Sequence, residues 1–222
     1  MIKIEIWSDV VCPFCYIGKR HLEQALQSLP PETTIQIEWK SFQLDPDAPK
    51  SGMEGATQLT TYEYLAKKYE VSVDDARAMT AQVSKMAELS GLRLNLEKAT
   101  PTSSEDAHRL LQFSKTLNLQ NQFKERLFKA HFVEGQNISN PQTLETLANE
   151  IGMPLKETRR ILDSDQFLDE VQKDSQEALN YGITGVPFFV FNRKYAISGA
   201  EPVTAFKKVF ENLKSDQTPI SN

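Results

Sequence analysis

Strand-like patterns occur only near the two ends of this 222-residue chain, and this placement limits the folds that it can adopt. Residues 2–7 alternate apolar and charged side chains, which is typical of a half-buried strand. A helical pattern follows over residues 14–29 and stops at Pro30. Alternation returns over residues 35–42. The order β-α-β predicts a parallel strand pair that is joined by a crossover helix.

The second group of strand patterns lies close to the C-terminus. Residues 187–191 are apolar and mainly aromatic, and residues 195–198 form a candidate return strand. Asn192 and Arg193 between them predict a tight two-residue turn. An amphipathic helix is predicted over residues 203–213. This end of the chain therefore contributes a hairpin and a helix.

The middle of the chain is helical throughout. Residues 45–52 are rich in turn-forming residues and predict a domain boundary. From residue 57 onwards helical periodicity recurs without a convincing strand, and Ser103 with Asp106 resembles a capping box. We therefore predict an α/β protein in which residues 1–45 and 170–222 form a discontinuous thioredoxin-like domain. Residues 46–169 form a large all-helical insertion domain.

Composition and charge exclude several classes of partner. Hydrophobic residues make up 40% of the chain, which is enough for a sizeable core. The net charge is -5, so no basic surplus exists to neutralise the phosphates of nucleic acid. No apolar run approaches the roughly 18 residues of a membrane span. The first residues lack the basic and then apolar pattern of a secretory signal, so we expect a cytoplasmic protein without a membrane partner.

Both cysteines of the chain lie in one short motif, Cys12-Pro13-Phe14-Cys15. A disulfide that closes so short a loop adds little stability, so this spacing indicates redox chemistry. The motif stands where a strand becomes a helix, and the helix N-terminus favours a thiolate by about one pKa unit. Cys12 is then the attacking thiol, and Cys15, one turn deeper, is the resolving thiol.

The cysteine pair has two other interpretations, part of a zinc site and a buried structural pair. A zinc site needs two further ligands, and His21, His108 and His131 do not show the spacing of a zinc motif, so no metal is predicted. Buried structural cysteines would gain nothing from a strand-to-helix turn. Far downstream, Val186 and Pro187 open a strand, and a proline at that point indicates an edge, a bulge or a cis bond.

Several segments together resemble the DsbA-like thiol-disulfide oxidoreductases, and within them the FrnE-like branch. The matching segments are residues 8–20, 107–110, 128–135, 185–191 and 198–202. The resemblance implies a thioredoxin core with a helical insertion, with Cys12 as nucleophile and Cys15 as resolver. It also implies a cis Pro187 against the redox pair and a Val186 backbone that pairs with an extended substrate.

Pro13, Phe14, Val186 and Pro187 are accordingly the predicted substrate-binding residues. Phe14 departs from the strongly oxidising periplasmic members, which carry a thiolate-stabilising histidine at that position. We therefore expect a Cys12 pKa that is lowered less, and a less oxidising pair. Glu5 is a candidate proton relay for the resolving cysteine; otherwise it lies on a solvated strand face.

The leading hypothesis is a thiol-disulfide oxidoreductase or isomerase that acts on protein or small-molecule disulfides. It needs no cofactor, with glutathione as a candidate redox partner. One alternative is a glutathione-dependent transferase or isomerase of the same fold, similar to 2-hydroxychromene-2-carboxylate isomerase. The other is a peptide-binding holdase without redox activity. In a reducing compartment, reduction or isomerisation is expected rather than net oxidation.

Overall fold

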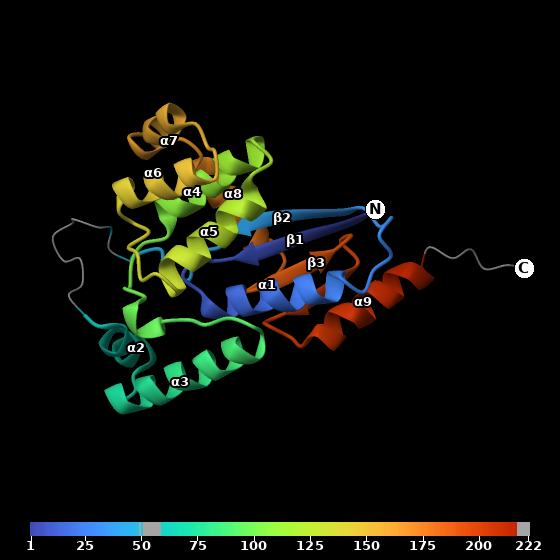
Figure 1. Cartoon of the computed structure of the whole chain (residues 1–222), viewed down its shortest axis with the longest axis horizontal. Helices are drawn as coiled ribbons and strands as arrows, with labels where there is room; N and C mark the ends of the chain where they lie inside the picture. The colour runs from blue at the N-terminus through green and yellow to red at the C-terminus, as the bar shows by residue number, and fades with distance from the viewer. Residues whose placement is uncertain (49, 51–58, 217–222) are drawn as a thin grey trace, which may run out of the picture.

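The computed structural model describes residues 1–48, 50 and 59–216. Four strands in this part of the chain form one mixed sheet in the order β2-β1-β3-β4 (Figure 1). They are β1 (Ile2–Ser8), β2 (Ile35–Ser41), β3 (Phe188–Phe191) and β4 (Tyr195–Ser198). β1 pairs with β2 in parallel and with β3 antiparallel, and β3 pairs antiparallel with β4. The two ends of the sequence thus share one sheet.

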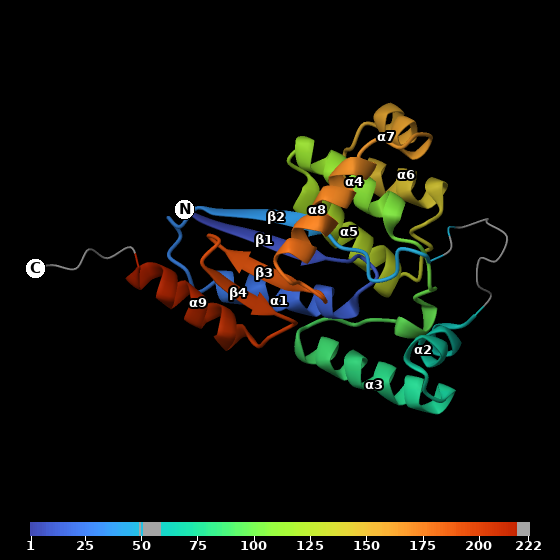
Figure 2. The ribbon, with the colours of Figure 1, turned by 180° about the vertical axis from the view of Figure 1, so that it is seen from behind.

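Helices cover both faces of this sheet. On one face, Ile4, Ile6 and Phe189 are fully buried in the core that the sheet shares with α1 (Pro13–Leu26) and α9 (Val203–Ser215). On the other face, Trp7 packs with residues of α8 (Leu168–Asn180), which lies in front of the sheet in Figure 2. Successive β1 side chains alternate between these two cores because the strand repeats every second residue.

The helical insertion consists of two groups that lie on opposite sides of the α1 N-terminus (Figures 1 and 2). The larger group is α4 (Glu105–Thr116), α5 (Gln120–Phe132), α6 (Pro141–Glu150) and α7 (Leu155–Leu162). The smaller group is α2 (Thr61–Tyr69), α3 (Val73–Leu89) and the short 3-10 turn η1 (Leu96–Lys98). The predicted thioredoxin-like α/β fold with a helical insertion is confirmed, and its division into two groups is new.

The structure shortens the first predicted helix, contradicts the predicted capping box and confirms the predicted hairpin turn. The first helix ends at Leu26 and not at residue 29, because the chain turns there, with Ser28 N donating to Ala25 O at 3.0 Å. The predicted capping box at Ser103 was wrong. Residue 104 is the N-cap, and its side chain accepts no capping hydrogen bond. Asp106 instead forms an ion pair with Arg109 at 2.7 Å. The turn at Asn192 and Arg193 is confirmed, with φ values of 49° and 55°.

The first predicted domain limit falls in the turn-rich stretch, and the second falls inside a helix. Of the turn-rich residues 45–52, positions 49, 51 and 52 lie outside the described residues. The second limit, between residues 169 and 170, falls inside α8, which begins at Leu168. α8 packs on the sheet, where Trp7 Nε1 donates to the backbone oxygen of Asp174 at 3.0 Å.

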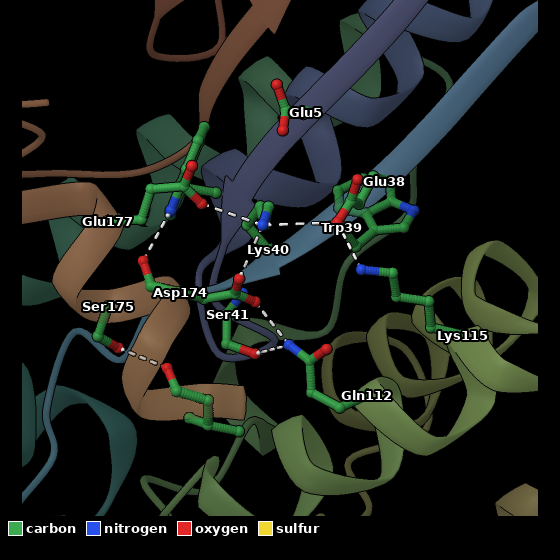
Figure 3. A network of polar contacts seen from close by, with 12 residues as sticks. Glu5, Glu38, Trp39, Lys40, Ser41, Gln112, Lys115, Asp174, Ser175 and Glu177 are labelled. Atoms are coloured by element: carbon green, nitrogen blue, oxygen red, sulfur yellow. Dashed lines mark hydrogen bonds and ion pairs between the residues drawn. The ribbon is translucent and has the colours of Figure 1, made fainter. Parts of the chain in front are cut away.

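A buried carboxylate joins the sheet to the helices around it. Asp174 on α8 accepts from Ser41 N at 2.8 Å, Gln112 Nε2 at 2.6 Å and Lys40 Nζ at 3.0 Å (Figure 3). These donors come from the end of β2 and from α4. Lys40 also pairs with Glu177 of α8 at 3.0 Å. One side chain therefore ties together β2, α4 and α8 next to Ser41, which pairs with Ser8 at the end of β1.

Candidate active site

The two cysteines stand at the start of α1, directly after β1. Cys12 is the N-cap residue with an extended backbone, Pro13 occupies the first turn, and Cys15 N donates to Cys12 O at 3.1 Å. Proline suits the first turn because the missing N–H would have no partner there. Both thiols are free and buried, with Cys12 3% and Cys15 1% exposed.

The C-terminal part of the chain meets this pair through one loop. The Val186–Pro187 peptide bond is cis, and Cys12 Sγ lies 3.6 Å from Val186 O, within hydrogen-bonding distance for a thiol. Gly18 makes the close approach of α1 to this loop feasible. A Cβ atom at Gly18 would stand 3.1 Å from Pro187 Cγ and 3.0 Å from Phe189 Cζ, so a larger residue would push the helix away.

The two sulfurs share a hydrogen bond, and their titrations are linked. The hydrogen bond to Cys15 and burial both raise the pKa of Cys12. Burial opposes ionisation of Cys15 as well, but the hydrogen bond from Cys12 and the positive charge of Lys124 lower the Cys15 pKa. In this resting geometry the pKa of Cys12 is therefore raised rather than lowered as expected, whereas the pKa of the deeper Cys15 is lowered.

Lys124 is the residue that the sequence analysis missed. Its side chain is 0% exposed, and its ammonium donates to Ser8 O at 3.2 Å and lies 4.9 Å from the ring centre of Phe128. No carboxylate of the described residues forms an ion pair with it. Burial lowers the pKa of Lys124 to about 8, although Cys15, Asp9 and Cys12 oppose the shift.

A signal for Lys124 was present in the sequence. It stands on α5 at spacings of three, four and seven residues before Leu127, Phe128 and His131, so it interrupts an apolar stripe. A lysine on the buried stripe of a helix is rare unless it has a local function or partner.

A second buried polar pair holds the turn between β1 and α1. Asp9 and His108 are both buried, and their Oδ1 and Nε2 atoms are 3.2 Å apart. Asp9 Oδ2 also accepts from Leu44 N at 2.8 Å. Burial raises the pKa of Asp9, but the contact with His108 and the backbone donor outweigh it, so the pKa is lowered. This pair connects the cysteine turn to α4.

Glu5 is buried, at 2% exposed, but its hydrogen-bond partners are Lys3 and Arg193 and not the cysteines. The carboxylate accepts from Arg193 Nη2 at 3.0 Å and from Lys3 Nζ at 3.2 Å. Burial opposes its ionisation, yet these two cations lower the pKa of Glu5. Glu5 is therefore buried rather than solvated, and the charged group that acts on Cys15 is Lys124.

An apolar pocket of about 360 Å³ opens beside Cys12. The predicted substrate-binding residues Pro13, Phe14 and Val186 line it together with Cys12, whereas neither Cys15 nor Pro187 does. α2, α3 and α5 supply most of the remaining wall. Only the first cysteine therefore faces the pocket, and the second faces Lys124 behind it.

Two further features of the described residues concern metal ligands and membrane-spanning helices. Within residues 1–48, 50 and 59–216, no three His, Cys, Asp or Glu side chains are grouped as metal ligands would be. No helix in those ranges has the length and apolar character that crossing a membrane requires.

Several known proteins share this architecture. The crystal structure of the probable DsbA oxidoreductase SCO1869 from Streptomyces coelicolor superposes with a TM-score of 0.90 at 30% identity, covering 100% of this chain and 94% of that one. The uncharacterized protein YwbO of Bacillus subtilis (strain 168) is 29% identical over 218 residues, or 97% of each chain. The cytosolic disulfide reductase DsbM from Pseudomonas aeruginosa, in its structure with GSH, shares the fold at 16% identity and a TM-score of 0.67, covering 96% and 99%.

The family match is equally extensive. The model of the DSBA-like thioredoxin domain matches residues 3–211, which run from β1 into α9 and include the whole helical insertion. A match of this extent includes both cysteines and the cis-proline loop. The chain therefore belongs to the DSBA-like thioredoxin domain family.

Proposed function

We propose that the protein catalyses dithiol-disulfide exchange through Cys12 and Cys15, and that it belongs to the FrnE-like branch of its family. The observation that carries this proposal is the sulfur pair itself. Two free thiols share a hydrogen bond at a helix N-terminus, and only Cys12 faces a pocket. A buried structural pair would not need a cation beside its deeper sulfur.

The geometry supports a specific order of steps. A proton that moves from Cys12 to Cys15 along their hydrogen bond leaves the thiolate on the sulfur that faces the pocket. Cys12 then attacks one sulfur of a bound disulfide, so that the substrate S–S bond breaks, a mixed disulfide forms and the first substrate thiolate leaves. Cys15 passes its proton to that thiolate and attacks Cys12, which forms the Cys12–Cys15 bond and releases the second thiolate. Lys124 stabilises the Cys15 thiolate in this second step, because its positive charge lowers the Cys15 pKa.

The same parts work in reverse, so the potential of the pair sets the direction of net exchange. Phe14 stands between the cysteines and is 38% exposed, where it supplies apolar contact and no charge. We propose the cytoplasm as the compartment, which is also the one named for DsbM. There the expected direction is reduction or isomerisation, with glutathione as a candidate redox partner. Pairing of the Val186 backbone with an extended substrate stays a prediction.

The test uses two single variants and a disulfide substrate. Wild-type protein should form an internal disulfide when it is treated with oxidised glutathione, as measured by thiol trapping and mass spectrometry. Cys12→Ser should lose exchange altogether, whereas Cys15→Ser should stop at a mixed disulfide on Cys12. Full exchange activity in Cys12→Ser would overturn the proposal.

The same variants separate the alternatives. A glutathione-dependent isomerase would keep its turnover in Cys15→Ser, since one cysteine suffices to bind a thiol. A holdase would prevent aggregation of a client equally well in Cys12→Ser. Neither alternative predicts a trapped mixed disulfide that Cys15 normally resolves.

A further inference from the structure

The pocket beside Cys12 carries information about the substrate. Its walls come from the β1–α1 turn, from α2 and α3, from α5 and from the cis-proline loop. Apolar side chains such as Leu65, Val83, Leu96 and Phe132 form most of the surface. A volume of about 360 Å³ is at the small end of ligand pockets, which suits a compact molecule.

The charges in this wall cancel each other. Among its described residues, the charged side chains are Asp45 and Lys68. Asp45 accepts from the hydroxyl of Tyr64 at 2.6 Å, and Lys68 Nζ lies 4.0 Å from the same carboxylate and donates to that hydroxyl at 3.3 Å. A substrate carboxylate would therefore compete with Asp45 for a single lysine, and one that went deeper would lose its water without compensation.

The histidine in the wall adds no charge either. His131 lines the pocket and is 3% exposed. Burial lowers the pKa of His131 to about 4, so the ring is neutral near pH 7. The wall therefore suits a ligand without a net charge.

The exposure of Cys12 argues against a folded protein as the substrate. Only 3% of this residue is exposed, and α2 and α3 lie over the pocket to which it opens. A disulfide on the surface of a folded protein cannot bring its sulfur in line with a sulfur so enclosed. A small molecule that enters the pocket can do so.

We propose that the pocket prefers a small, uncharged, mainly apolar disulfide or dithiol to charged ones such as glutathione, which then exchanges more slowly, and that Cys12 exchanges with the preferred substrate there. This inference rests on the proposed exchange function and names its substrate class. In the reducing direction, the S–S bond of the substrate breaks and the Cys12–Cys15 bond forms. The two protons and two electrons of the enzyme dithiol pass to the two substrate thiols. The reverse reaction oxidises a dithiol of the same class.

The test compares two dithiols that differ in a single group. Oxidised protein is mixed with dihydrolipoamide or with dihydrolipoate, which have the same sulfur atoms and chain but end in an amide or a carboxylate. We expect single-turnover reduction by dihydrolipoamide to be faster by roughly tenfold or more, because the carboxylate is disfavoured in the pocket. Equal rates, or a faster reaction with dihydrolipoate, would overturn the inference.

Pocket variants make the test specific to this site. Val83→Trp should fill the cavity and slow dihydrolipoamide, whereas Lys85→Trp, which adds the same ring on the exposed side of α3, should not. Val83→Lys should reverse the preference towards dihydrolipoate, a gain that misfolding cannot imitate. If Val83→Trp leaves the rate unchanged, or if Val83→Lys leaves the preference unchanged, the pocket is not where exchange occurs.

Treatment with excess dithiothreitol distinguishes failure of the proposed exchange function from failure of the proposed substrate class. If even this reductant never converts the oxidised pair to thiols, the exchange function itself fails. If dithiothreitol reduces the pair fully while the charge preference and the Val83 effects are absent, the exchange function stands and the small apolar substrate is wrong.

Discussion

At the scale of single residues, the behaviour of the redox pair depends on a buried lysine that forms no ion pair with a carboxylate of the described residues. Lys124 is fully buried against Phe128 and within reach of the charge on Cys15. Burying an ammonium without a carboxylate partner is unfavourable, so the fold retains it at a cost in stability. The cost is offset only when a thiolate is present, which couples Lys124 to the redox state of the pair.

Lys124→Met should therefore raise the pKa of Cys15 by roughly one unit or more, since a nearby positive charge is removed. The reduced form loses a stabilising contact, so the pair becomes less oxidising, by about 30 mV for each 1.4 kcal/mol lost. Ultraviolet thiolate absorbance against pH measures the first effect, and equilibration with glutathione measures the second. Lys129→Met, on the exposed side of the same helix, is the matched control; an equal shift there would contradict the role of Lys124.

The same substitution should stabilise the reduced protein at pH 7. The pKa of Lys124 falls from 10.5 unfolded to about 8 folded, which corresponds to a cost of about 3 kcal/mol. This cost is fully present below pH 8 and is relieved as the pH rises from 8 to 10.5. The gain of Lys124→Met in urea unfolding should therefore shrink across that window. A gain that is independent of pH would indicate repacking instead.

At the scale of elements, polar joints fix where the helices stand relative to the sheet. Asp174 collects donors from β2 and α4 while its own helix covers the sheet (Figure 3). The helical periodicity that recurs after residue 57 predicts helices in this part of the chain, but nothing in it identified Asp174 as buried. Its partners Ser41 and Gln112 are more than 60 positions away, so only the folded chain brings them together.

Asp174→Ala should lower the free energy of unfolding by about 3 kcal/mol, because it leaves the buried backbone N–H of Ser41 and one of the two amide hydrogens of Gln112 without an acceptor. Urea denaturation measures the loss. Glu170→Ala, at an exposed position on the same helix, should change stability by less than about 0.5 kcal/mol. Similar losses in the two variants would show that the joint at Asp174 adds nothing.

At the scale of the whole molecule, ion pairs connect the sheet domain to the insertion. Glu125 of α5 pairs with Lys19 of α1 at 2.7 Å and with Arg20, and Glu38 of β2 pairs with Lys115 of α4 at 2.5 Å. Burial works against both carboxylates, yet these cations lower the pKa of Glu125 and of Glu38 to about 2. The two domains are therefore held together partly by charges that acid removes.

Stability should accordingly fall as the pH drops from about 4.5 towards 2. A carboxyl whose folded pKa is depressed contributes fully above its unfolded pKa and loses that contribution as it is protonated in the folded state. Urea unfolding at pH 7, 4.5 and 3 measures the slope. The double variant Glu38→Gln and Glu125→Gln should flatten it, whereas Glu211→Gln, at an exposed position on α9, should not. An unchanged slope in the double variant would exclude these joints as the source.

The sequence by itself determined the elements and the reactive pair. Alternation in residues 2–7 and 35–42 reflects burial on a pleated sheet, and the helical stripes reflect a 3.6-residue repeat, both of which are local properties. The spacing of Cys12 and Cys15 at a strand-to-helix turn is local as well. For the same reason the sequence predicted the turn at Asn192, whose backbone conformation few residues tolerate.

Only the tertiary structure decided what surrounds each sulfur and in which direction its pKa moves. The helix N-terminus visible in the sequence favours a thiolate on Cys12, but in the folded chain the contact between the sulfurs and burial raise the pKa of Cys12, while the contact with Cys12 and the distant residue Lys124 lower the pKa of Cys15. Likewise Glu5 is as near in sequence as a relay requires, yet Arg193 holds it from across the sheet. Burial and electrostatics depend on every neighbour in space, whereas periodicity depends only on neighbours along the chain.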